Sequence, residues 1–251
     1  MRGGRWPANL ATLANLLVGI GAVLYVLAGN PLWAMLLITS GVGFDGLDGF
    51  LARKAGLGPS RFGRIADSIA DATTFGIAPA ALLIVHTDHA ELWRPLASLS
   101  WGVGILFAAL SIARLVYFTL RGYQNPDFLG APTPQSALAL VVFTLFVGVP
   151  GFLGVYPTVL LGLAAVIAIV MVLPIPYPKI RRGHPIRLPL AVSGAALVVT
   201  LLPLQFHLAR SSPFFLLAEA AGTVALAGVA IYYLVGPFTV PRAPPAAGDH
   251  P

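Results

Sequence analysis

The stretch that organises this chain reads DGLDGFLAR at residues 45–53 and, after nine further residues, GRIADSIAD at residues 63–71. The chain of 251 residues has only nine acidic side chains, and four of them lie between Asp45 and Asp71. Asp45 and Asp48 are three residues apart, and Asp67 and Asp71 are four apart, so each pair projects from one face of a helix. Four carboxylates in an apolar chain require a counter-charge, and this requirement is the main indication of function.

The composition is that of a membrane protein. The chain is 57% hydrophobic and 10% charged, with a mean hydropathy of +0.86, whereas soluble domains carry roughly 25% charged residues. The alternation of polar and apolar residues that a spanning β-barrel requires is absent. There is no cysteine, which excludes disulfides and thiol chemistry. The net charge of +6 fits loops facing anionic headgroups, and no nucleic-acid partner is expected. We therefore predict an all-α, polytopic integral membrane helix bundle.

Apolar runs of about 20 residues, the length that crosses the hydrocarbon core, predict eight transmembrane helices. Glycine and proline mark many of the breaks between these runs. The predicted spans are residues 8–29, 31–52, 60–86, 92–121, 134–154, 157–175, 185–207 and 213–236. A single transmembrane domain is expected over residues 1–240, followed by a disordered tail rich in proline and alanine at residues 241–251.

The basic residues predict the orientation of this bundle. With a cytoplasmic amino terminus, only Arg94 and Arg210 fall on the outer side. The inner side then holds Arg2, Arg5, Arg53, Lys54, Arg61, Arg64, Arg114, Arg121, Lys179, Arg181, Arg182, Arg187 and Arg242. This positive-inside bias supports an even number of spans in the cytoplasmic membrane and places the four aspartates on the side facing the cytoplasm.

The short link from Lys54 to Pro59 makes the second and third spans antiparallel neighbours, so the two aspartate pairs can face each other. Carboxylate ligands without nearby His or Cys favour hard ions such as Mg²⁺ or Mn²⁺. Four carboxylates can hold two such ions, and two-metal sites clamp phosphoryl oxygens during displacement reactions. Gly49 and Gly63 would allow close approach, and Arg53 offers a planar fork for phosphate.

Two other interpretations of the aspartates remain open on spacing alone. They could pair with Arg53, Arg61 and Arg64 at a hydrated membrane boundary, without any catalytic role. They could also line an ion or proton pathway, because buried acids mark transport routes as well as catalytic centres.

The complete pattern Asp-x2-Asp-Gly-x2-Ala-Arg-x(8–9)-Gly-x3-Asp-x3-Asp resembles that of the CDP-alcohol phosphotransferases, and the resemblance covers about half the chain. It implies that Asp45 and Asp67 bridge two divalent cations, while Asp48 and Asp71 each complete one site. It further implies that Asp71 is the general base for an acceptor alcohol, whose hydroxyl attacks the β-phosphate of a CDP-linked lipid and releases CMP. The substrate-binding residues implied in this way are Asn9, Thr12, Gly49, Ala52, Arg53, Ser60 and Gly63, with a nucleotide-binding edge around residues 8–11.

Flanking sequences are similar to the phosphatidylserine synthase branch of that family. They are NLATLAN at residues 9–15, FGIAP at residues 75–79 and GAPTP at residues 130–134. This similarity implies L-serine as the acceptor and CDP-diacylglycerol or its archaeal ether counterpart as the donor, with Arg114 reaching the serine carboxylate. The chain departs from the branch after Arg114, where the run RLVYFT lacks a second Arg and an Asn.

Alternative functions follow from the same residues. Glycerol 3-phosphate or an inositol phosphate could replace serine, with Arg61 and Arg64 binding the additional phosphate. An intramembrane prenyltransferase also uses two aspartate-rich helices with Mg²⁺, but the Gly-x2-Ala-Arg sequence after Asp48 argues against it. An ion transporter is the remaining alternative. A homodimer is expected, because members of the family that this chain resembles are often dimers.

Overall fold

The computed structural model describes residues 6–56, 60–88, 97–121, 128–148, 157–178, 186–205 and 213–240. Nearly all of them are helical. The helices are α1 (Trp6–Leu27), α2 (Pro31–Lys54), α3 (Arg61–Asp71), the π-helical segment η1 (Ala72–Ile77), α4 (Ala78–Asp88), α5 (Ala97–Arg121), α6 (Thr133–Gly148), α7 (Pro157–Val172), α8 (Arg187–Gln205), α9 (Pro213–Val235) and the 3₁₀ turn η3 (Gly236–Thr239).

Within the described ranges these elements form eight helical stretches, because α3, η1 and α4 follow one another without interruption. Each stretch overlaps one of the eight predicted spans, and the number of stretches that cross the membrane stays a prediction. Five stretches are long and apolar enough to cross a membrane. The apolar parts of α6, α7 and α8 are shorter. The prediction of an all-α polytopic membrane bundle is confirmed. The predicted tail at residues 241–251 lies outside the described residues, so its disorder stays a prediction.

Glycine and proline set the helix boundaries as the sequence predicts. Gly29 has a φ of 74°, a left-handed conformation that glycine adopts without strain, and it separates α1 from α2. α2 then begins at Pro31, where the missing N–H is not needed. Gly56, with a φ of 65°, follows the end of α2 in the same way. The turn at Gly29 makes α1 and α2 an antiparallel pair.

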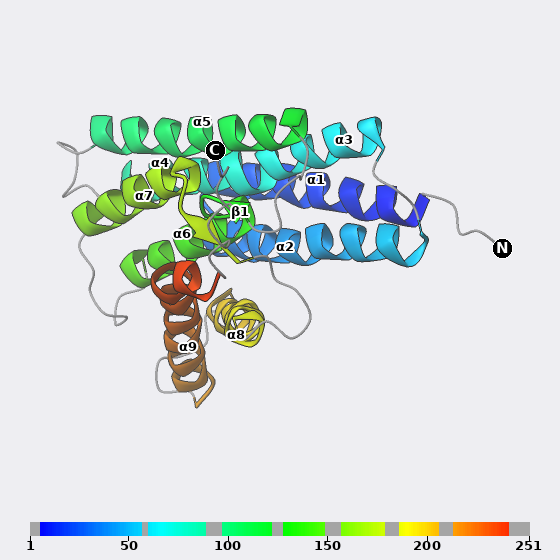
Figure 1. The fold of residues 1–251 in the computed structure, drawn as a ribbon. Coiled ribbons are helices and arrows are strands. Elements are labelled where there is room, and N and C mark those ends of the chain that lie inside the picture. The colour runs from blue at the N-terminus through cyan, green and yellow to red at the C-terminus, as the bar shows by residue number, and fades with distance from the viewer. Residues whose placement is uncertain are drawn as a thin grey trace.

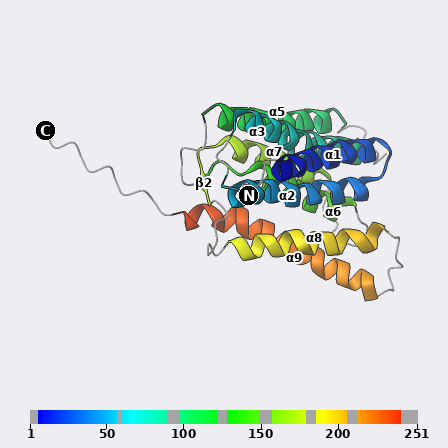
Figure 2. The same ribbon diagram turned by 90° about the vertical axis from the view of Figure 1, so that its right-hand side faces the viewer.

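The helices form a main bundle and a separate hairpin. In Figure 1, α1, α2, α3 and α5 run side by side, and the start of α1, the end of α2 and the start of α3 lie at the same end. Helices α8 and α9 pack against each other and lie along one side of this bundle (Figure 2). The side chains of α6 from Ala137 to Val142 are almost fully buried, so α6 is a central helix of the bundle.

A two-residue ladder was not predicted from the sequence. Strand β1 (Phe128–Leu129) pairs antiparallel with β2 (Pro176–Tyr177), which ties the approach to α6 to the segment after α7. Gly130 follows with a φ of 77°, and a Cβ there would lie 2.0 Å from the carbonyl oxygen of Met171. The ladder therefore depends on a glycine that has both a left-handed backbone and no side chain.

Candidate active site

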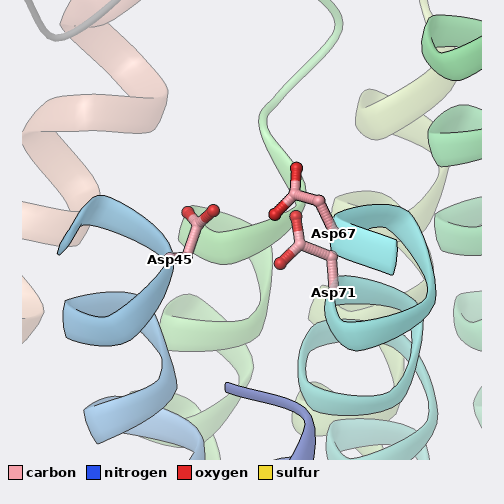
Figure 3. A group of neighbouring side chains, drawn as sticks. All are labelled: Asp45, Asp67 and Asp71. Carbon is pink, nitrogen blue, oxygen red and sulfur yellow. The ribbon is translucent and has the colours of Figure 1, made fainter. Parts of the chain in front are cut away.

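Three of the four aspartates meet between α2 and α3. Asp45 on α2 faces Asp67 and Asp71, which project from one side of α3 (Figure 3). One carboxylate oxygen from each residue lies within 4.8 Å of the others. Asp71 is buried, whereas Asp45 and Asp67 are half-buried. The predicted meeting of the two helix faces is therefore correct for these three residues.

The start of α3 is fixed by a helix cap. The Ser60 hydroxyl oxygen accepts a hydrogen bond of 3.0 Å from the backbone N–H of Gly63. A Cβ at Gly63 would lie only 2.9 Å from that hydroxyl oxygen, so glycine gives the cap its space. Ser60 and Gly63 thus have a structural role about two turns and one turn before Asp67, and their contact with substrate stays a prediction.

Asp48 differs from the other three aspartates. Its Oδ2 accepts a hydrogen bond of 2.7 Å from the Thr12 hydroxyl on α1, and its side chain is only 9% exposed. Its carboxyl group also lies beside that of Asp67. The structure therefore brings Thr12, a predicted substrate-binding residue, to the edge of the acidic group through Asp48.

Asp71 is held by a residue that the sequence interpretation did not place in the site. The Nδ2–H of Asn15 on α1 donates a hydrogen bond of 2.9 Å to Asp71 Oδ1. Asn15 is completely buried. A polar residue in the middle of an otherwise apolar span was the signal that could have identified it.

The remaining predicted residues around α2 line the same end of the bundle. The guanidinium group of Arg53 lies against Gly49, where a Cβ would be 3.2 Å from Nη1. Gly49 thus makes room for Arg53 on the helix surface. Arg53 itself is exposed, Ala52 is half-buried, and Asn9 is exposed near the start of α1.

Arg114 on α5 is buried, with 7% of its surface exposed. Its Nη1 donates a hydrogen bond of 2.9 Å to the Thr133 hydroxyl at the start of α6. Its guanidinium carbon lies 4.7 Å from the centre of the Phe118 ring, a cation–π distance. The next turn of α6 carries Ser136, whose hydroxyl is 2.7 Å from that of Tyr233 on α9. A buried polar group therefore connects α5, α6 and α9.

The carboxylate cluster fits a divalent cation. The side chains that α1 provides as hydrogen-bond donors to these aspartates, Thr12 to Asp48 and Asn15 to Asp71, are uncharged. Among the described residues, Asp67 Oδ1 is buried and has no hydrogen-bond partner. Three carboxylates at this separation repel one another unless positive charge lies between them. An all-oxygen ligand set of this kind is typical of hard cations such as Mg²⁺ and Mn²⁺.

Comparisons with known proteins show the family to which this chain is similar. Residues 5–224 match the family model described as CDP-alcohol phosphatidyltransferase. The chain is 34% identical over 174 residues to a CDP-diacylglycerol–serine O-phosphatidyltransferase of Methanocaldococcus jannaschii, a match that covers 68% of this chain and 73% of the relative. It is 30% identical over 173 residues to an archaetidylserine synthase of Methanothermobacter thermautotrophicus, covering 68% of this chain and 69% of the relative. A CDP-diacylglycerol–serine O-phosphatidyltransferase of Mycobacterium bovis is 31% identical over 137 residues, and that match spans 52% of this chain and 46% of the relative.

Proposed function

This chain belongs to the CDP-alcohol phosphatidyltransferase family, and from that membership we propose that it transfers a phosphatidyl group from a CDP-linked lipid to L-serine and releases CMP. The observation that carries the proposal is the meeting of Asp45, Asp67 and Asp71 on facing helices. The names of the relatives support serine as the acceptor and either a diacylglycerol or an archaeal ether lipid as the donor.

The proposed reaction forms one bond to phosphorus and breaks another. The serine hydroxyl oxygen attacks the β-phosphorus of the CDP-lipid, and the bond from that phosphorus to the oxygen bridging it to CMP breaks. Asp71 takes the hydroxyl proton, since it is the most buried carboxylate of the cluster and Asn15 already holds one of its oxygens. CMP leaves with the electron pair of the broken bond.

Asp45, Asp48, Asp67 and Asp71 would hold two divalent ions, Mg²⁺ or Mn²⁺. When bound, such ions would neutralise charge on the phosphoryl oxygens and on the departing CMP. The hydrogen bond from Thr12 holds Asp48 on the α1 side of the site. The chain's own contribution is thus a set of carboxylates fixed by neutral donors from α1.

The donor and the acceptor would approach from different sides of the cluster. Arg53 and Gly49 lie beside Asp48 on α2 and would contact the diphosphate, together with Asn9, Ala52, Ser60 and Gly63 at the same end of the bundle. Arg114 would bind the serine carboxylate through its planar fork, oriented by the hydrogen bond to Thr133. The proposed placement puts the aspartates on the cytoplasmic side of the cell membrane, and the proposed assembly is a homodimer.

Purified protein in detergent tests this function directly. The protein is supplied with a CDP-lipid and Mg²⁺ or Mn²⁺, and serine, glycerol 3-phosphate, an inositol phosphate or no acceptor is added. Released CMP and the lipid product are measured by chromatography and mass spectrometry. We expect CMP release that depends on serine and is abolished by a chelator. Release only with a phosphorylated acceptor would replace serine by that acceptor, and no release under any condition would refute the transferase assignment.

The Asp71→Asn variant tests the assigned base. Replacing the carboxylate by an amide of the same shape removes the proton acceptor, and general-base catalysis contributes about 10² to 10⁴ in rate. We expect kcat to fall by about that factor while the protein elutes from gel filtration like the wild type. Wild-type turnover in this variant would contradict the role given to Asp71.

A further inference from the structure

The α1 residue Asn15 makes an unusual buried contact with the acidic cluster. Its amide donates to Asp71 Oδ1 at 2.9 Å, and the side chain has no exposure to solvent. We propose that Asn15 is a positioning residue that orients the Asp71 carboxyl group, so that one oxygen is held by the amide and the other is left available to the cation and to the acceptor hydroxyl. The reference to an acceptor rests on the proposed function, whereas the orientation of a cation ligand does not.

The amide oxygen of Asn15 shows that packing alone does not account for this residue. Among the described residues, Asn15 Oδ1 is buried without a hydrogen-bond partner, and a buried unsatisfied oxygen costs stability. An apolar side chain of similar size, such as leucine, would avoid that cost. The hydrogen bond to Asp71 is the interaction that a leucine could not make. It also fixes the orientation of the amide, because a flipped amide would point its oxygen at a carboxylate oxygen.

Asn15 also contacts the chain just beyond Asp71. The hydroxyl of Thr74 donates a hydrogen bond of 2.8 Å to the main-chain carbonyl of Asn15. Thr74 lies in η1, the π-helical segment that begins immediately after Asp71. Asn15 therefore contacts the chain on both sides of the junction between α3 and η1. Its side chain bonds Asp71 at the end of α3, and its main-chain carbonyl accepts from Thr74 in η1. Widened turns of this kind occur frequently at functional sites.

Two glycines make this close approach possible. A Cβ at Gly19 on α1 would lie 2.3 Å from the Thr74 hydroxyl oxygen. A Cβ at Gly41 on α2 would lie 2.4 Å from Thr74 Cγ2 and 3.1 Å from Asn15 Oδ1. The Asn15 amide is thus closely surrounded by residues of α1, α2 and η1, and it has little space to move. A fixed amide is what the orientation of a carboxylate requires.

A double-mutant cycle with Asn15→Leu and Asp71→Asn tests the proposal. Mn²⁺ binding to the purified protein is measured by the electron paramagnetic resonance signal of free Mn²⁺, and kcat and KM are measured with CDP-lipid and serine. Loss of an outer residue that orients a metal ligand typically costs 10-fold to 100-fold in metal affinity or activity. We expect Asn15→Leu to weaken Mn²⁺ binding and lower kcat by about that factor, with both KM values changed less than about threefold.

The cycle separates positioning from general support of the fold. If Asn15 acts through Asp71, Asn15→Leu has no further effect on Mn²⁺ affinity in the Asp71→Asn background. An equal loss in both backgrounds, or wild-type Mn²⁺ affinity in Asn15→Leu, would overturn the proposal. Thr39→Val is the matched control, because Thr39 is a buried α2 residue whose hydroxyl bonds only the Met35 carbonyl among its described contacts. It should bind Mn²⁺ like the wild type.

Because leucine differs in shape from the Asn15 amide that it would replace, a variant with a smaller side chain is tested as well. Asn15→Ala removes the amide without adding volume, and it should reproduce the loss of Mn²⁺ affinity. Failure of both Asn15 variants to fold, while Thr39→Val folds, would overturn positioning in favour of a purely structural role. The Mn²⁺ measurements need no turnover. If the wild type released no CMP, the proposed function would fail, and the cycle would still decide the role of Asn15.

Discussion

Asp48 shows how far residue spacing alone can place a side chain. At about 100° per residue, a spacing of four leaves Asp67 and Asp71 only about 40° apart around α3, so both face Asp45. A spacing of three separates Asp45 and Asp48 by about 60° in the opposite sense, which turns Asp48 towards Thr12 on α1. The sequence predicts the four aspartates as one group. It could not predict that Thr12 would be the partner of Asp48, because the position of α1 depends on tertiary packing.

The acceptor specificity can be tested at Arg114, which the sequence also identified. Arg114→Lys keeps the positive charge but loses the planar fork that matches a carboxylate. Hydrogen bonds to charged groups contribute about 1.5 to 3 kcal/mol, so we expect the KM for serine to rise by about 10-fold to 100-fold. The KM for the CDP-lipid should change little, and this second constant serves as the internal control. Equal increases in both constants would contradict a role in acceptor binding.

At the scale of elements, the helices were predictable and their irregularities were not. Proline and glycine mark the start of α2 and the break before α6 in the sequence itself. The π-helical segment after Asp71 contains Gly76 and precedes Pro79, but these residues do not by themselves distinguish a π-helix from an α-helix. It accompanies the packing of Thr74 against Gly19 and Gly41, which are distant in sequence. The ladder between β1 and β2 is likewise a contact between segments far apart in the chain.

The ladder supplies a prediction about stability. Gly130→Ala would place a methyl group against the Met171 carbonyl and strain a left-handed backbone. Strain and overpacking each cost about 1 to 3 kcal/mol, so we expect a loss of about 2 to 6 kcal/mol in the free energy of unfolding. Thermal unfolding in detergent measures this loss. Gly162→Ala on α7 is the control, because its new methyl group would meet no atom within 4 Å. Equal stability of the two variants would show that the ladder does not depend on Gly130.

At the scale of the whole molecule, a group of basic residues lies at the same end of the bundle as the acidic cluster. Arg53, Lys54, Arg61 and Arg64 lie where α2 ends and α3 begins, the end that also carries the acidic cluster (Figure 1). Anionic lipid and the diphosphate of a CDP-lipid would both be attracted to such a basic rim. These four basic residues are also among those from which the orientation in the membrane was predicted. If this end of the bundle faces the cytoplasm, the acidic cluster must face the cytoplasm as well.

The orientation can be tested because the chain contains no cysteine, so a single introduced cysteine is the only thiol that reacts. Phe62, at the start of α3 beside the basic rim, is 76% exposed. Asn30, in the turn between α1 and α2, is exposed at the opposite end. With the basic rim facing the cytoplasm, a membrane-impermeant maleimide should label Asn30→Cys in intact cells. Phe62→Cys should be labelled only after the membrane is opened, because α2 separates the two positions by the thickness of the bilayer. The unmodified chain should give no signal in either condition. The reverse pattern would place the aspartates outside the cell, where no cytoplasmic CDP-lipid could reach them.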